Sequence, residues 1–502
     1  MKQRDLVIAI DCSTTASKAV VWDYLGNLIA IGRQGYDLQH VKSGWVEQNA
    51  NDWWIATSTA ITNVVKQIDP NRIAALAITH QRETFVCLDE YGEPVRPAMT
   101  WMDIRATEEV ASYGTPQVHR LTGKPPNPTP AWYKLLWLKK YEAENLTRTR
   151  RVVDVGGYLI QKLTGQWATS WASADPLGLV NLSTFSYDPY LVSEAGISEN
   201  QLPRLVAPGK KIGELKAEIA KSLGLPDGLT VVAGAGDGQS AGLGCNVTRP
   251  GRAYLNLGTG AVSGVYGEGY RYDTSYRTMG GSIPGSYIFE TFIGGGTLNI
   301  SWFVENFGSA EKNSIQNQSV EQIFETAAST IAPGADKLLC LPYWSGAMTP
   351  YWDGNARGAF VGLAGLHSKA HMYRAILEGI AFEQRFLTEG VEKATGTPIE
   401  EIIILGGGSS SPLWCQIIAD VMGRKVKIVR EQETTSLGAG IHAAAAVGLH
   451  SSLIEAADRM TGVEREYHPR TDIHSTYSSF FVAYCSLYPN LKASFSLLSK
   501  IT

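Results

Sequence analysis

The hydrophobic pattern near the N-terminus predicts short strands that alternate with a helix. The runs LVIAID (6–11) and AVVWD (19–23) are apolar and rich in β-branched residues, and the small polar stretch CSTTASK (12–18) between them predicts a hairpin. Farther on, apolar residues recur with helical spacing over 51–68, and the run 72–79 predicts another strand. Alternation of this kind indicates an α/β protein.

The same pattern returns in the second half of the chain. AYLNL (253–257), GTGA (258–261) and VSGVYG (262–267) again have the order strand, small-residue turn, strand. This recurrence favours an internal duplication of one domain design, although two unrelated hairpins would look alike at this level. A helix over 371–395, a buried strand over 400–405 and a helix over 412–423 follow.

The length of the chain predicts two domains. Its 502 residues exceed a typical domain about threefold. A boundary near 244–252 divides the chain into two parts of similar size, 1–245 and 246–502, and we expect an active cleft between them. We expect the aromatic residues of the last segment, 474–491, to form a helix that packs on the core rather than on a partner.

Composition and charge exclude several classes of protein. Hydrophobic residues make up 44% and charged residues 18% of the chain, which argues against disorder, and a net charge of -4 argues against a nucleic-acid partner. No apolar run is long enough to span a membrane. The six cysteines lack the spacing of a zinc site, so we expect buried, reduced thiols in a soluble, cytoplasmic protein.

Three turns of small residues are candidate phosphate contacts. They are CSTTASK at 12–18, GTGA at 258–261 and GGGSSS at 406–411, and each follows a predicted strand. Such turns let backbone N–H groups approach phosphates, although each one alone is more often a structural turn. Neither a Walker A loop nor GxGxxG with a downstream acidic residue is present, which disfavours P-loop and Rossmann folds. Added hydroxyl donors are Ser13, Thr14, Thr15 and Thr259.

Two aspartates follow predicted strands and have two interpretations each. Asp237, between Gly236 and Gly238, comes after the run 229–233 and is sterically open to a ligand whose hydroxyl proton it would accept. The alternative is a helix N-cap. Asp11 is either a ligand of a metal ion or water, or a turn residue.

Polar residues at two further strand ends are candidates for binding a polyhydroxylated ligand. Gln81, Arg82 and Glu83 end one strand, and Asp103 and Arg105 lie in WMDIR (101–105), where Trp101 suits the apolar face of such a ligand. The alternative is a solvated, salt-bridged loop. The histidines show no metal-ligand spacing, whereas Mg²⁺ held mainly by phosphates and water would leave little trace in a sequence.

Together these segments resemble the FGGY family of carbohydrate kinases over about residues 5–450. The most specific piece is GAFVGLAGLHSKAHMYRAILEG (358–379), which is similar to the second signature of that family. CSTTASK resembles its first phosphate loop, with Ser13 in place of the usual glycine. GAGDGQSAG resembles its catalytic-aspartate loop, LGTG (257–260) its second phosphate loop, and 405–421 its adenosine segment.

The first signature of the family is poorly kept around TPAWYKLLWLKKY (129–141). Lys134 fits it, whereas Ala131 and Tyr141 depart from it. Gly238 stands where glycerol kinases have Gln, and Thr129 where they have Tyr, so the chain is more similar to xylulokinase-like members than to glycerol kinases.

The resemblance implies an α/β fold of two actin-like, ribonuclease H-like domains with a catalytic cleft between them. It also implies ATP and Mg²⁺ as cofactors, a sugar or polyol substrate, and a homodimer. A non-catalytic actin-like nucleotide-binding protein and an ATPase of the same fold are the alternatives. The implied site residues are Asp237 as base, Asp11 for the metal, Gln81, Arg82, Glu83, Trp101, Asp103 and Gln239 for the acceptor, and Ser13, Thr14, Thr15, Lys18, Gly258, Thr259, Gly260, Gly407, Gly408 and Ser411 for ATP.

Overall fold

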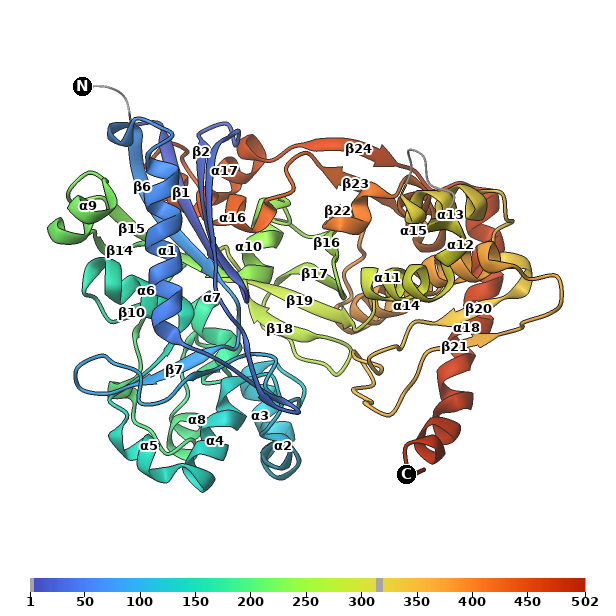
Figure 1. The fold of residues 1–502 in the computed structure, drawn as a ribbon, viewed down its shortest axis with the longest axis horizontal. Helices are drawn as coiled ribbons and strands as arrows, with labels where there is room; N and C mark the ends of the chain where they lie inside the picture. The colour runs from blue at the N-terminus through green and yellow to red at the C-terminus, as the bar shows by residue number, and fades with distance from the viewer. Residues whose placement is uncertain (1–3, 313–318, 502) are drawn as a thin grey trace.

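The computed structural model describes residues 4–312 and 319–501, which form two lobes (Figure 1). The N-terminal lobe is built on a six-stranded sheet with the order β14-β15-β6-β1-β2-β3. Every residue of its central strand β1 is buried, as expected of a strand that is covered on both faces. The strands are β1 (Leu6–Cys12), β2 (Ala16–Asp23), β3 (Leu28–Gly35), β6 (Ile73–His80), β14 (Lys211–Glu214) and β15 (Thr230–Gly236).

The C-terminal lobe is built on a seven-stranded sheet with the order β18-β19-β17-β16-β22-β23-β24. Its strands are β16 (Arg252–Leu257), β17 (Ala261–Glu268), β18 (Arg277–Gly280), β19 (Ser286–Ile293), β22 (Glu401–Leu405), β23 (Lys425–Val429) and β24 (Val463–Tyr467).

The two sheets share one topology. In the first, β1 pairs antiparallel with β2 and parallel with β6, and β6 pairs parallel with β15. In the second, β16 pairs antiparallel with β17 and parallel with β22, and β22 pairs parallel with β23. The predicted duplication, and with it the α/β fold of two ribonuclease H-like units, is therefore confirmed.

A smaller sheet and short helices extend the N-terminal lobe. Residues 131–148 form two helices rather than one, because Glu142 leaves the helical conformation with φ -133° and ψ 47°. The sheet contains β4 (Gln39–Lys42), β5 (Trp45–Gln48), β7 (Phe85–Leu88), β8 (Ala98–Met99) and β9 (Arg151–Asp154), and the helices are α2 (Thr107–Tyr113), α3 (Pro116–Thr122), α4 (Ala131–Tyr141), α5 (Ala143–Arg148), α7 (Trp171–Ala174) and α8 (Pro189–Glu194).

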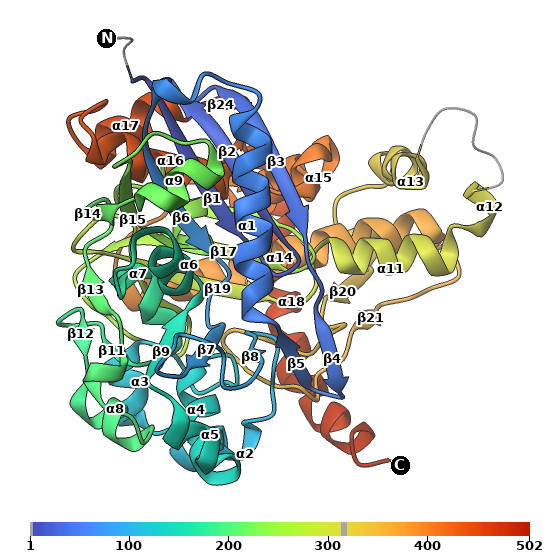
Figure 2. The same ribbon diagram turned by 60° about the vertical axis from the view of Figure 1, so that its left-hand side comes forward.

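Helices cover the outer faces of both main sheets (Figure 2). Helix α1 begins at a capped end, where the Asn49 side chain accepts a hydrogen bond from the backbone N–H of Asn51. Helix α14 ends where Gly396 takes the left-handed φ of 68°, which glycine adopts without strain. The covering helices are α1 (Ala50–Val65), α6 (Val155–Thr164) and α9 (Ala217–Leu223) in the first lobe, and α11 (Thr297–Phe307), α13 (Val320–Ser329), α14 (Lys369–Thr395) and α15 (Pro412–Met422) in the second.

One helix from each half packs on the sheet of the other half. Helix α16 (Thr434–Ala446) covers β1 and β6, whereas α10 (Asp237–Gly244) covers β16, β19 and β22. The two helices lie side by side, because Gly244 and Gly438 have no side chain: a Cβ there would come within 2.0 Å of the Thr434 carbonyl oxygen and 1.9 Å of that of Ser240. The division of the chain at 245/246 stays a prediction, since the helices exchange across it.

The C-terminal segment packs on the second lobe. Helix α18 (Thr471–Leu498) buries Tyr477, Phe481 and Tyr484 against α14, as expected from the sequence, while its end reaches beyond the body (Figures 1 and 2). All six cysteines are free; five are buried, and Cys485 is only half-buried, so the prediction of burial is wrong there. None of the helices in the described ranges is both long and apolar enough to span a bilayer.

Candidate active site

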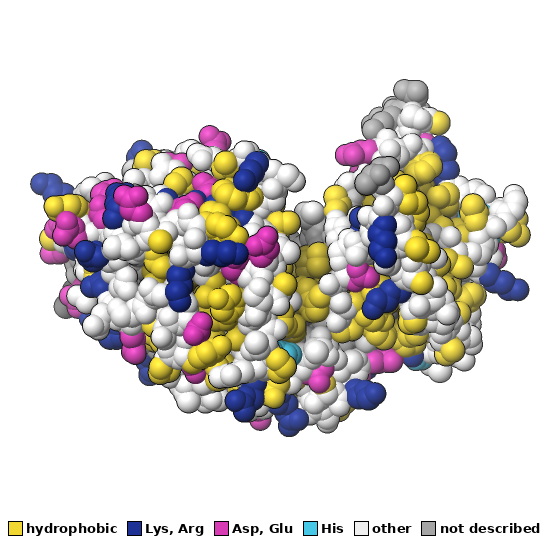
Figure 3. Space-filling model, turned by 90° about the horizontal axis from the view of Figure 1, so that it is seen from below, with side chains coloured by type: hydrophobic (Ala, Val, Ile, Leu, Met, Phe, Trp, Pro, Cys, Tyr) yellow, Lys and Arg dark blue, Asp and Glu magenta, His cyan; other side chains and the backbone are white. Residues whose placement is uncertain are grey.

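The two predicted phosphate turns occupy equivalent positions in the two lobes. Residues 13–15 join β1 to β2, and residues 258–260 join β16 to β17. In each turn the threonine at the tip is exposed, Thr15 in the first and Thr259 in the second. A hollow separates the lobes in Figure 3.

Several of the predicted nucleotide-binding groups are engaged within the protein. The Ser13 hydroxyl donates to the Ala16 carbonyl at 2.9 Å, and Thr14 Oγ1 accepts a hydrogen bond of 3.0 Å from Trp101 Nε1. The Lys18 ammonium pairs with Glu433 at 2.7 Å, which ties the first lobe to the start of α16. Gly260 packs closely, because a Cβ would lie 2.6 Å from the Phe292 ring. Thr15, Gly258 and Thr259 are therefore the more accessible candidates.

The third turn contains one open position and two structural ones. A Cβ at Gly407 would meet nothing within 4 Å, whereas one at Gly408 would lie 2.6 Å from the Trp414 ring. Ser411 caps helix α15 by accepting from the N–H of Trp414 at 3.1 Å, and its hydroxyl donates to Glu325 at 2.7 Å. We therefore assign packing to Gly408 and helix capping to Ser411, and only Gly407 faces open space.

Asp11 is a buried carboxylate at the end of β1. It is 8% exposed, and among the described residues its Oδ1 atom has no hydrogen-bond partner. Burial, followed by the nearby negative charge of Asp237, raises the pKa of Asp11 to about 7. No group of three or more His, Cys, Asp or Glu side chains within 4–312 and 319–501 is arranged to hold a metal ion.

Asp237 is the first residue of α10, directly after β15. The N-cap of that helix is Gly236, so the alternative interpretation of Asp237 as the N-cap is wrong. The Asp237 side chain is 41% exposed, and its Oδ1 atom accepts a hydrogen bond of 2.7 Å from the N–H of Gly238. An accessible carboxylate at the start of a helix, beside the buried Asp11, is well placed to meet a ligand.

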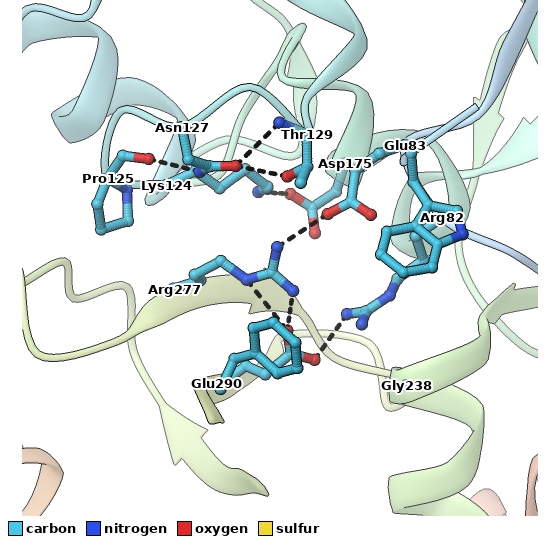
Figure 4. A network of polar contacts seen from close by, with 12 residues as sticks. Arg82, Glu83, Lys124, Pro125, Asn127, Thr129, Asp175, Gly238, Arg277 and Glu290 are labelled. Atoms are coloured by element: carbon cyan, nitrogen blue, oxygen red, sulfur yellow. Dashed lines mark hydrogen bonds and ion pairs between the residues drawn. The ribbon is translucent and has the colours of Figure 1, made fainter. Parts of the chain in front are cut away.

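A series of alternating charges leads from Asp237 across to the second lobe, and Figure 4 shows the part of it from Arg82 to Glu83. Arg82 Nε lies 2.8 Å from Asp237 Oδ1, and Arg82 Nη1 donates to Glu290 Oε2 at 2.7 Å. Glu290, in β19, also accepts from Arg277 in β18, whose Nη1 donates to Glu83 at 3.1 Å. We call Asp237, Arg82, Glu290, Arg277 and Glu83 the charge ladder.

The buried arginines keep Glu290 ionised. Burial alone would raise the pKa of Glu290, but the positive charges of Arg82 and Arg277 outweigh it and lower that pKa to about 2. Burial likewise opposes the charge of Arg82, yet the carboxylates of Glu290 and Asp237 raise its pKa well above the usual value. Glu290 and Arg82 are thus stabilised by their charged neighbours rather than by water.

The two glycines beside Asp237 make room for Arg82. A Cβ at Gly236 would lie 2.5 Å from Arg82 Cγ, and one at Gly238 would lie 3.0 Å from the guanidinium carbon. Arg82 therefore lies against the start of α10, where any side chain at 238 would crowd its guanidinium. The sequence pattern explained these glycines by access for a ligand, and the structure adds this second reason.

The predicted acceptor-binding residues divide into those that belong to the ladder or are exposed, and those that are buried outside the ladder. Arg82 and Glu83 belong to the ladder, and Trp101 is 36% exposed. Glu83 has a φ of 58°, which is costly for a residue with a side chain and is typical of functional sites.

The remaining three candidates are buried. Gln81 donates to Gln48 at 2.8 Å, and Gln239 donates to the carbonyl of Ala172 at 2.9 Å. Asp103 accepts from Arg105 and from the N–H of Val46, and both ion-pair partners are wholly buried. All three are thus engaged within the protein, as is Arg105 in this pair, and their roles toward an acceptor stay predictions.

The sequence patterns did not indicate four charged residues, two from the second lobe and two from the first. Glu290, Arg277 and the buried pair Lys124–Asp175 lie beside the predicted site. One signal was present: Glu290 interrupts the apolar strand SYIFETFI (286–293), and a charge in a buried strand requires a partner.

Comparisons with known proteins match the chain to one family over most of its length. Residues 6–244 match the N-terminal domain, and residues 253–447 the C-terminal domain, of the FGGY family of carbohydrate kinases. The chain is 28% identical to a xylulose kinase of Staphylococcus epidermidis over 495 residues, 97% of each protein. It is 25% identical to a gluconokinase of Bacillus subtilis over 491 residues, 96% of this chain and 95% of that protein.

The fold is also similar to a solved structure. The crystal structure of ligand-bound xylulose kinase from Lactobacillus acidophilus matches with a TM-score of 0.92 and 29% identity, and the match covers 98% of this chain and 99% of that one.

Proposed function

The chain belongs to the FGGY family of carbohydrate kinases, and we propose that it transfers a phosphoryl group from ATP to a hydroxyl of a small sugar or polyol, with a ketopentose such as xylulose as the leading acceptor. The full-length similarity to xylulose kinases supports this acceptor. A glycerol kinase-like or other polyol kinase is the alternative. Gly238 and Thr129 argue against glycerol, since both positions differ from the pattern of glycerol kinases noted above.

The accessible carboxylate of Asp237 carries the proposal. As the acceptor oxygen attacks the γ-phosphorus, its O–H bond breaks and Asp237 takes the proton. The new O–P bond forms while the bond between the γ-phosphorus and the leaving oxygen of ADP breaks. Arg82, at 2.8 Å from Asp237, holds this carboxylate in place.

Positioning of the phosphates falls to the two equivalent turns. Backbone N–H groups and the hydroxyls of Thr15 and Thr259 offer donors from opposite lobes, and Gly407 leaves space for the adenosine. Closure of the lobes would exclude water, which a kinase must do to avoid hydrolysing ATP.

Asp11 fits a role in holding Mg²⁺, directly or through water. Its Oδ1 atom is buried without a partner among the described residues, and carboxylate oxygen is the ligand type that Mg²⁺ prefers. When bound, the ion would neutralise charge on the transferring phosphoryl group. A nearby divalent cation would also favour the ionised form of Asp11, whose pKa is raised to about 7 without it.

A non-catalytic nucleotide-binding protein of the same fold is the alternative from another class. It would have no use for the accessible Asp237, nor for the strained Glu83 of the charge ladder. Self-association into a homodimer stays a prediction from the resemblance.

Coupled ADP release tests the proposal. The acceptors are xylulose, ribulose, fuculose, glycerol, erythritol, arabinitol, xylitol and gluconate, each measured with wild type and Asp237→Asn. We expect one acceptor to support turnover, and the substitution to lower it by about 10² to 10⁴ because the base is lost. Asp458→Asn, at an exposed aspartate of helix α17 (Leu453–Met460), is the matched control and should leave turnover unchanged.

ATP hydrolysis that needs no acceptor and survives Asp237→Asn would contradict the proposal. It would instead support the ATPase interpretation. Nucleotide binding without any turnover would support the non-catalytic one.

A further inference from the structure

The charge ladder joins residues from both lobes at the acceptor site. Arg82 and Glu83 follow β6 of the first lobe, while Arg277 and Glu290 lie on β18 and β19 of the second. All four side chains are at most 11% exposed. Buried ionic groups of this kind fix one another's orientation, because moving one leaves another without its counter-ion.

Both cations of the ladder are already paired with carboxylates. It has three carboxylates, Asp237, Glu290 and Glu83, and two guanidinium groups, Arg82 and Arg277. Neighbouring Lys124 is already paired with Asp175, which also accepts from the N–H of Gly280 at 2.8 Å. Within the part of the chain that the structure describes, each of these cations faces a carboxylate. An acceptor that carries a carboxylate would have to compete with these pairs.

Hydroxyl groups suit the same surface better. The ladder alternates donors and acceptors, and a hydroxyl both donates and accepts without adding charge. A carboxylate brought into this site would lose its hydration beside the ladder, which has one more carboxylate than guanidinium group, and the neighbouring buried Lys134 already donates to the carbonyl oxygens of Thr100 and Thr129. The difference between the two kinds of acceptor is therefore electrostatic rather than steric.

We propose that Glu290 and Arg277 are specificity-determining positioning residues that adapt the acceptor site to an uncharged polyhydroxylated substrate and against an aldonate. They act through Arg82 and Glu83, which their ion pairs hold in place. Gly238 permits the arrangement, because a Cβ there would lie 3.0 Å from the Arg82 guanidinium carbon. This inference rests on the proposed kinase function and adds its substrate class.

Opposite changes in the charge of the ladder test the inference. ADP release is measured with xylulose, xylitol and gluconate for wild type, Glu290→Gln and Arg277→Met, and the ratio of kcat/KM for gluconate to that for the better neutral acceptor is compared. Glu290→Gln removes a negative charge and should raise the ratio at least about tenfold, mainly through a lower KM for gluconate. Arg277→Met removes a positive charge and should lower it.

Glu383→Gln is the matched control. Glu383 is equally buried in the second lobe, but its hydrogen bonds are to Tyr343 and Tyr484 rather than to the ladder. The ratio of kcat/KM for gluconate to that for the better neutral acceptor should be the same in Glu383→Gln as in wild type. Thermal melts of all variants check folding, and if Glu290→Gln does not fold, Arg277→Met still tests the predicted direction.

Three results have distinct meanings. A wild-type preference for gluconate overturns this inference and leaves the kinase function standing. A shift in the same direction for Glu290→Gln and Arg277→Met also overturns it, since general damage to the site would explain both. Absence of ADP release with every acceptor overturns the proposed function, and this inference with it.

Discussion

Glu290 and Glu383 are both buried in the second lobe, but their surroundings are opposite. Glu290 is 0% and Glu383 2% exposed. Glu290 lies between two arginines, whose charges outweigh burial and lower its pKa to about 2. Glu383, on α14, accepts hydrogen bonds from Tyr343 and from Tyr484 of α18, which bring no charge, and burial raises its pKa to about 7.

The difference shows that burial alone does not decide the charge of a carboxyl group. Two hydrogen bonds from neutral hydroxyls do not replace the hydration that Glu383 loses, whereas two guanidinium groups more than replace it for Glu290. The protein thus maintains charge where the lobes meet at the candidate active site. Under α18, where the contact is structural, it holds a carboxyl group that is protonated over much of the neutral range.

Removing Arg82 should have the largest effect of the changes considered. Arg82→Met leaves Glu290 with one counter-ion and Asp237 with none, so the free energy of unfolding should fall by about 3–5 kcal/mol. ADP release should fall at least about 100-fold, since the base and the acceptor contact are both disturbed. Chemical denaturation and the coupled assay measure the two effects.

An exposed arginine provides the comparison. Arg72 pairs with Asp5 at 2.6 Å but is 42% exposed, so Arg72→Met should leave ADP release unchanged. Equal losses for the two variants would mean that the ladder has no special role.

Glu383→Gln should remove a dependence of stability on pH. The folded pKa of about 7 lies above the ordinary value of 4.5, so the folded protein binds a proton that the unfolded chain has released. This contribution to stability is complete below about pH 4.5 and is lost as the pH rises through 7, an effect of about 3 kcal/mol by pH 8. Denaturation at pH 5.5 and 8 should show that the stability of wild type falls relative to that of Glu383→Gln.

The contribution of Glu290 to stability changes with pH in the opposite direction and in another pH range. Its folded pKa of about 2 lies below 4.5, so its contribution is complete above about pH 4.5 and is lost only as the pH falls through 2. The difference between wild type and Glu290→Gln should therefore stay constant from pH 5.5 to 8. The comparison would be contradicted if the stability difference between wild type and Glu290→Gln changed with pH in this range, or if that between wild type and Glu383→Gln did not.

Local patterns predicted the strands, the long helices and the duplication, because period and turn residues act over short distances. They did not predict the break at Glu142, since the apolar spacing continues through it. The position of Asp237 after a strand was predicted, but the ladder was not. Its members come from segments far apart in the sequence, and pairing such as that of Arg82 with Glu290 depends on how the lobes meet.

The buried positions of Gln81 and Asp103 illustrate the same limit. Polar residues at a strand end predict a crevice, but the sequence does not show which of them the protein satisfies internally. Gln48 accepts a hydrogen bond from Gln81, and Arg105 forms an ion pair with Asp103. The family resemblance implied that Lys18 binds ATP, and its partner Glu433 belongs to the other half of the chain.

The Lys18–Glu433 pair should show the smallest effect and so extends the comparison to partly exposed charges. Its side chains are 27% and 30% exposed, so water already stabilises both ions and salt screens their attraction. A double-mutant cycle with Lys18→Met and Glu433→Gln, followed by chemical denaturation, should give a coupling free energy below about 1 kcal/mol. The coupling should shrink further when salt is raised from about 0.1 to 1 M. A coupling that does not change with salt and is as large as the loss of stability expected for Arg82→Met would mean that the pair is shielded from water as Glu290 is. Exposure would then not separate the two kinds of contact between the lobes.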